Sequence, residues 1–172
     1  MRRALLLISL LMGVGTACMA YDTTPLQIAI WPPSLQVVPP EIDVSGLKLN
    51  LPYGGNETIV GVDLGIASTS NNTSALQINL VNCAHERFSG FQVGLLNLSG
   101  ESRGLQIGVL MNSTDEVGSG LQIGIINSTT EMNGVQIGLI NYTHFMIGFQ
   151  VGLVNIIRES IVPFFPIVNF CF

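Results

Sequence analysis

Apolar and polar residues alternate in a short segment that recurs along the chain. From Gly104 to Val109, every second residue is Leu, Ile or Val, and Gln and Gly lie between them. This alternation predicts a β-strand, because successive side chains of a strand point to opposite faces. A polar, turn-rich segment such as 128–133 follows each strand. A helix is disfavoured, since each of the regularly spaced glycines would cost about 1 kcal/mol in a helix interior.

The same unit, Gly-x-Gln-x-Gly-x-x-Asn, recurs along most of the chain. Its copies begin at residues 46, 61, 75, 90, 104, 120, 134 and 148, at intervals of 14 to 16 residues. Degenerate copies lie before and after them, at 25–32 and 163–169. The array departs from the unit at Ala75 and Asn79, which replace its two glycines, and at Met111, which is an extra residue. Self-similarity at a fixed interval indicates a stacked repeat.

Residues 1–20 have the pattern of a secretory signal peptide. Arg2 and Arg3 precede an apolar run, and small residues follow it. The apolar run is too short to span a membrane. Two processing outcomes stay open, namely cleavage after Ala20 and lipidation of Cys18. We therefore expect an exported protein of the cell envelope, in the outer membrane, at the cell surface or in the periplasm.

The repeat and the signal pattern together predict the organisation of the chain. The predicted segments are a signal peptide (1–20), an N-terminal leader and cap (21–45), the repeat array (46–161), and a degenerate C-terminal repeat and cap (162–172).

Two all-β architectures fit a strand followed by a short turn. The favoured one is a β-solenoid of about nine coils of 14–16 residues, with coils stacked in parallel about 4.8 Å apart. The alternative is an antiparallel outer-membrane β-barrel, which the apolar C-terminus ending in Phe172 favours. Such barrels alternate short turns with longer loops, whereas the connections here are of one class. This uniformity favours the solenoid.

Parallel stacking would also place identical side chains one above another, where their amides can hydrogen-bond as a ladder. The predicted glutamine ladder contains Gln77, Gln92, Gln106, Gln122, Gln136 and Gln150. The predicted asparagine ladder contains Asn82, Asn97, Asn112, Asn127, Asn141, Asn155 and Asn169. An antiparallel barrel gives identical residues no such neighbours.

Prolines occur near both ends of the array, at Pro32, Pro33, Pro163 and Pro166. Proline cannot donate a backbone hydrogen bond, so we expect these four residues to cap the exposed edges of an open stack.

The aliphatic side chains of each strand are expected to point inward, which leaves Gln and Gly as a flat outer stripe. Four large residues late in the unit would fill the opposite side of the core: Phe88, Val117, Met132 and Met146. The reverse orientation would bury the glutamines at about 1 to 3 kcal/mol for each unpaired amide. Only a complete ladder would make that orientation tolerable.

The array resembles the bacterial surface-repeat proteins first grouped from spirochaetes and found widely in Gram-negative envelopes. The shared features are the signal peptide, the repeated unit, an opening like Pro25–Ile28, and a close like Asn155–Arg158 followed by 163–169. The resemblance extends over residues 25–172 and implies an exported, surface-associated protein. It brings with it no activity and no catalytic residue.

Charge and candidate chemistry narrow the function further. The formal net charge is −5, and it is −7 without residues 1–20, so a nucleic-acid partner is not expected. His85 and His144 occupy equivalent positions in coils too far apart to share a metal, and no ligand cluster accompanies them. Cys83 and Cys171 would lie six coils apart, about 29 Å by the coil spacing, and could not form a disulfide within one chain.

Neither a catalytic constellation nor a cofactor motif occurs, so we expect no enzyme, cofactor or metal site. The leading hypothesis is a non-enzymatic envelope protein whose repeated β surface, either the Gln and Gly stripe or the turn ridge, makes binding or structural contacts. Its partner would be an envelope or surface ligand, and membrane association and self-association stay open. The alternative is an integral outer-membrane barrel acting as a small pore or anchor.

Overall fold

The structure, a computed structural model, describes residues 23–31 and 35–172. The predicted signal peptide with both of its processing sites, and the caps Pro32 and Pro33, lie outside the described residues. Within the described ranges the chain is all-β, and no helix is long and apolar enough to cross a membrane. Its strands are β1 (Thr23–Trp31), β2 (Leu35–Gln36), β3 (Asp43–Ile137), β4 (Ile140–Ile157) and β5 (Phe164–Cys171).

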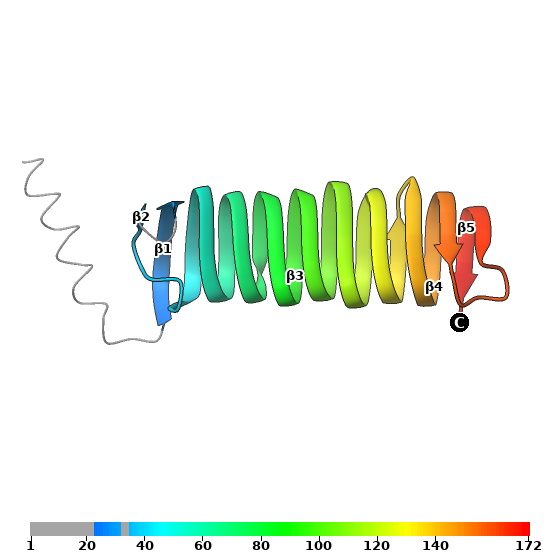
Figure 1. The fold of residues 1–172 in the computed structure, drawn as a ribbon, viewed down its shortest axis with the longest axis horizontal. Coiled ribbons are helices and arrows are strands. Elements are labelled where there is room, and N and C mark those ends of the chain that lie inside the picture. The colour runs from blue at the N-terminus through cyan, green and yellow to red at the C-terminus, as the bar shows by residue number, and fades with distance from the viewer. Residues whose placement is uncertain (1–22, 32–34) are drawn as a thin grey trace, which may run out of the picture.

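Extended backbone continues through the segments that were expected to be turns. β3 alone is 95 residues long, and it winds around one long axis so that each turn lies beside the next (Figure 1). Glu131 pairs with Phe145, and Met132 pairs with Met146, in the same parallel register as the strands of the repeated unit. The connections are therefore a second set of strand segments, because their residues also alternate between buried and exposed positions.

Neighbouring copies of the unit pair in parallel. Asn127 lies opposite Asn141, and Gln136 lies opposite Gln150, at an offset of 14 residues. β1 is parallel to the start of β3, with Gln27 opposite Lys48. The sheet has the order β2-β1-β3-β4-β5 and is open, with β2 and β5 as its edges. The alternative of an antiparallel barrel is therefore wrong, since adjacent copies run the same way and the sheet does not close.

β5 reverses the direction of the chain at the C-terminal edge. It is antiparallel to β4 and places Asn169 opposite Gln150. The degenerate last copy therefore does not continue the parallel stack. Pro166 lies within β5, and Pro163 precedes it and accepts a hydrogen bond from the backbone of Ile157. Both prolines are thus at an edge of the sheet, where a missing N–H donor leaves no neighbour unpaired.

The orientation of the repeated strand is the reverse of the expected one. Gln106 is 1% exposed, whereas Val109 in the same strand is 55% exposed. The expectation of an aliphatic interior is wrong because the array hydrogen-bonds the glutamines to one another, which removes the penalty for burying them. The interior is mainly Gln, Asn, Ser and Thr, and the aliphatic side chains face outward.

The opposite side of the interior contains three of the four large residues predicted there. Phe88, Met132 and Met146 are buried, and Met132 and Met146 pack with Ile157. Val117 is exposed, which corrects the prediction for this residue. Its unit is 16 residues long, and Gly118 occupies the buried position instead.

The first glycine of the unit is required by the backbone at the corner of each coil. Gly120 has φ +121°, a conformation that side-chain-bearing residues rarely adopt. A Cβ added there would lie against the carbonyl oxygen of Gly104 in the preceding coil, far inside the 3.0 Å limit of real contacts. Positive φ and close approach of the backbones both demand glycine at this position.

Candidate binding surface

The glutamines form a continuous hydrogen-bonded ladder inside the coils. Each Nε2 donates to Oε1 of the glutamine in the preceding coil, at 2.8–2.9 Å. The ladder contains Gln77, Gln92, Gln106, Gln122, Gln136 and Gln150, all at most 2% exposed. All the amide N–H groups in the ladder therefore point toward the N-terminal end of the stack.

Hydroxyl groups brace this ladder from across the interior. Gln122 donates to Thr114 at 3.1 Å and accepts from Thr129 at 2.9 Å. The threonines lie on the second strand segment of each coil. The two segments therefore face one another across the Gln–Thr contact, and their outward side chains form opposite faces of the molecule.

The asparagines form a second ladder with the opposite direction. Each Nδ2 donates at 2.8 Å to Oδ1 of the asparagine in the following coil. This ladder contains Asn82, Asn97, Asn112, Asn127, Asn141 and Asn155. The extra residue Met111 does not interrupt it.

Asn169 was predicted to extend the asparagine ladder, and the structure places it elsewhere. Its Nδ2 lies 3.4 Å from the carbonyl oxygen of Val162. Asn155 instead donates to the carbonyl oxygens of Gly152 and Phe165. The reversal of β5 explains this difference, because an antiparallel strand does not bring Asn169 above Asn155.

The second glycine of the unit makes room for the asparagine ladder. A Cβ added to Gly138 would lie 2.7 Å from Nδ2 of Asn127 and 3.1 Å from Oδ1 of Asn141. Asn79 occupies this position in its own coil and donates to Oδ1 of Asn82 at 2.8 Å. The departure from glycine at Asn79 thus supplies the donor that the N-terminal end of this ladder needs.

Two charged residues replace glutamine in the first coils. Lys48 and Asp63 are both fully buried, and they occupy the glutamine position of the copies that begin at residues 46 and 61. Asp63 accepts hydrogen bonds from Asn50, Ser68 and Gln77. The carboxylate therefore terminates the glutamine ladder at the end toward which its N–H groups point.

Lys48 is linked to Asp63 through a hydroxyl group. Its Nζ donates to Ser68 at 3.1 Å and to the carbonyl oxygen of Gly54 at 3.3 Å, and Ser68 donates to Asp63. Burial lowers the pKa of Lys48 to about 8, and the charge of Asp63 partly opposes this shift. The sequence analysis missed this pair, although alignment of the copies places both residues in the glutamine column.

The outward side chains of the repeated strand form a continuous aliphatic face. This face is defined by its exposed members: Leu47, Leu51, Ile66, Leu76, Ile78, Leu80, Phe91, Leu95, Val109, Leu110, Ile125, Ile137, Leu139, Ile140, Phe149, Val151 and Leu153. Their exposed fractions run from 36% to 66%. No charged residue occurs in the strand segments 76–82, 91–97, 105–112, 121–127, 135–141 and 149–155.

Charged side chains are concentrated on the opposite, polar face. They come from the second strand segments and include Glu57, Glu86, Arg87, Glu101, Arg103, Asp115, Glu116, Glu131 and Glu159. Arg87 and Glu101 form an ion pair at 3.0 Å. Because both partners are substantially exposed, this pair contributes little to stability. The molecule is therefore amphipathic along its whole length.

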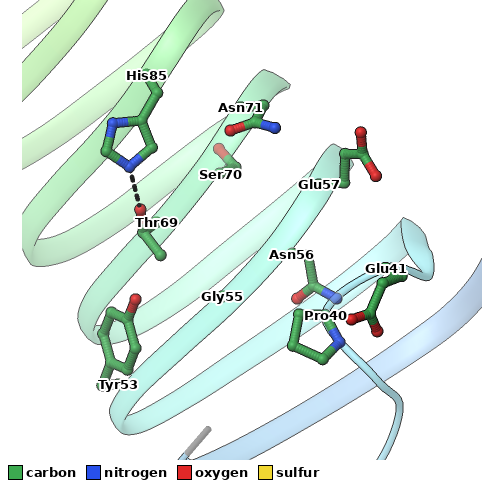
Figure 2. Close-up of a pocket in the computed structure, with 10 residues that line it drawn as sticks. All are labelled: Pro40, Glu41, Tyr53, Gly55, Asn56, Glu57, Thr69, Ser70, Asn71 and His85. Carbon is green, nitrogen blue, oxygen red and sulfur yellow. Dashed lines mark hydrogen bonds between the residues drawn. The ribbon is translucent and has the colours of Figure 1, made fainter. Parts of the chain in front are cut away.

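A groove of about 550 Å³ crosses the first coils on the polar face (Figure 2). It is lined by Pro40, Glu41, Tyr53, Gly55, Asn56, Glu57, Thr69, Ser70, Asn71 and His85. His85 interacts with the hydroxyl of Thr69 at 3.1 Å (Figure 2). His144 lies elsewhere and contacts the hydroxyl of Tyr142 at 3.0 Å. Within the described ranges, no three His, Cys, Asp or Glu side chains gather in a metal-binding group.

Cys83 and Cys171 are both free thiols, which confirms that they do not bridge. Burial raises the pKa of the Cys83 thiol above its usual value.

Comparison of the chain with family models, with curated proteins and with solved structures found no match.

Proposed function

We propose that this chain is a non-enzymatic, exported protein of the cell envelope or surface, and that it folds as a β-solenoid of about nine coils. Its repeated β surface makes binding or structural contacts. Parallel pairing at an offset of 14 residues, winding around one axis and the two amide ladders support the solenoid. The resemblance to envelope surface-repeat proteins supports the assignment to the envelope.

The observation that carries the proposal is the uncovered aliphatic face. Soluble monomers rarely expose a continuous apolar patch of more than a few hundred Å². This face extends along the coils from Leu47 to Leu153 with no charge in its strands. The Gln and Gly stripe that was expected to make the contacts is buried, so the contact surface is the aliphatic one.

Co-sedimentation with envelope fragments tests this proposal. Val109→Lys, Ile125→Lys and Leu139→Lys, combined in one chain, place three charges on the aliphatic face, where all three residues are exposed. A matched control places three lysines on the polar face through Ser74→Lys, Thr130→Lys and Asn133→Lys, which are also at exposed positions. The wild-type chain and the control are expected to co-sediment, and the aliphatic-face variant is expected to stay in the supernatant. Equal sedimentation of all three chains would contradict the proposed contact surface.

A further inference from the structure

We infer that the partner of the aliphatic face is a second copy of this chain, and that the protein is a face-to-face homodimer. This inference rests on the proposed function, because it assigns a partner to the same surface. It goes further by requiring that the surface be self-complementary.

The size of the face matches what a stable dimer needs. About eight coils at 4.8 Å give a length of about 38 Å, and the outward residues of one unit span about 17 Å at 3.3 Å per residue. Each copy would therefore cover about 650 Å², or about 1,300 Å² for the pair, which lies within the range of specific interfaces. A smaller patch would not meet this requirement.

The regularity of the face suits a partner with the same surface. Side chains such as Ile125 and Leu139 stand in register in successive coils, so the face presents parallel rows separated by one coil. Rows on one copy can enter the gaps between rows on the other, as in the dry interfaces between stacked sheets. A two-fold axis in the plane of contact lets one surface supply both halves of the interface.

The distribution of charge favours a second copy over a lipid surface. The polar face carries mostly carboxylates, and the net charge without residues 1–20 is −7. An anionic membrane surface repels such a molecule, and segments that lie on membranes usually carry a basic polar face. In a face-to-face pair, the aliphatic faces contain no charges to repel one another, and the acidic faces point to opposite sides.

Sedimentation velocity of the purified protein over a wide concentration range tests the dimer. The wild-type chain and the polar-face control are expected to sediment at twice the monomer mass. The aliphatic-face variant V109K/I125K/L139K is expected to dissociate at least about a hundredfold more readily, because like charges then face one another in an apolar interface. Circular dichroism of all three chains at each concentration shows whether the variant retains the β fold of the wild type.

The outcomes separate this inference from the proposed function. A wild-type chain that stays monomeric at high concentration overturns the dimer. If that monomer binds neutral phosphatidylcholine vesicles or envelope fragments through the aliphatic face, the proposed contact surface stands and its partner is not a second copy. If it binds neither, both proposals fail. If the aliphatic-face variant stays folded and dimeric, the dimer uses another surface and the inference is wrong. If the variant unfolds, the conservative variant V109T/I125T/L139T repeats the measurement, and an unweakened dimer again overturns the inference.

Discussion

Gln77 donates a hydrogen bond of 2.8 Å from Nε2 to Oδ2 of Asp63, so the glutamine ladder ends on a carboxylate. Because the amide dipoles of that ladder all point the same way, a negative charge is favourable where their N–H groups converge. The asparagine ladder runs in the opposite direction, and Asn79 donates to its free carbonyl at Asn82. The first coils thus terminate the two ladders with chemically opposite groups.

Asn79→Gly is expected to destabilise the protein, although it restores the glycine of the repeated unit. The substitution leaves Oδ1 of Asn82 without the donor that it has in the wild type. One buried acceptor without a partner costs about 1–3 kcal/mol. Chemical denaturation followed by circular dichroism measures this loss. Asn133→Gly, at an exposed position, controls for the flexibility of glycine. Equal losses for the two variants would show that Asn79 has no role as a cap.

Gln122→Glu is expected to cost about 3 kcal/mol or more at neutral pH, because it buries an uncompensated charge. A carboxylate cannot donate to Gln106 or Thr114, which both accept from Nε2 of Gln122. The loss should shrink at low pH, where a protonated carboxyl group is neutral and can donate again. Denaturation at two pH values gives both quantities. Asn133→Asp is the exposed control, and a similar loss there would count against the buried ladder.

Gly120→Ala is expected to cost about 2 kcal/mol or more, because the residue has φ +121° and meets the backbone of the neighbouring coil. Thermal unfolding measures the loss. Gly55→Ala is the matched control, since Gly55 is not among the positive-φ glycines and its nearest neighbour would be a side-chain methyl at 3.3 Å. If the control costs as much as Gly120→Ala, the corner of the coil is not the constrained point.

The free energy of unfolding is expected to rise between pH 8 and about 10.5, because Lys48 has its pKa lowered to about 8 by burial. In this range the unfolded chain holds a proton that the folded chain has released, so raising the pH favours the folded state. The full effect is about 3 kcal/mol, and below pH 8 it is constant.

Lys48→Gln is expected to abolish this rise, since glutamine is the usual residue at that position. Cys83 works in the opposite sense, because its raised pKa makes the folded state lose stability as the unfolded thiol ionises. Both pH profiles are therefore measured in a Cys83→Ala background. Parallel profiles with and without Lys48 would rule out its titration as the cause.

The direction of stacking could be predicted from the sequence, whereas the orientation of the strand could not. Identical amides such as those of Gln122 and Gln136 recur at constant spacing, and only parallel neighbours bring them together. Judged residue by residue, Leu and Ile belong inside and Gln outside. The buried amides are tolerable only because each one satisfies the next. That satisfaction belongs to the array and not to any single unit.

Details at irregular copies were predicted less well, for local reasons. Val117 was placed inside because its unit was read without the shift that its extra residues impose. The segment at 163–169 keeps the spacing of the array, yet its chain reverses to form β5. Lys48 and Asp63 escaped attention because charged side chains are rarely fully buried unless paired. Their positions in the glutamine column were the available signal.

The opposed ladders have a consequence for the evolution of this chain. Every interior coil offers the same donors and acceptors to the coil before it and the coil after it, so a whole unit can be duplicated or lost without leaving a mismatched pair. Deleting residues 120–133, for example, joins Ser119 to Gly134 and restores both ladders across the junction. Length can therefore drift among descendants of such a gene while the specialised ends stay unchanged.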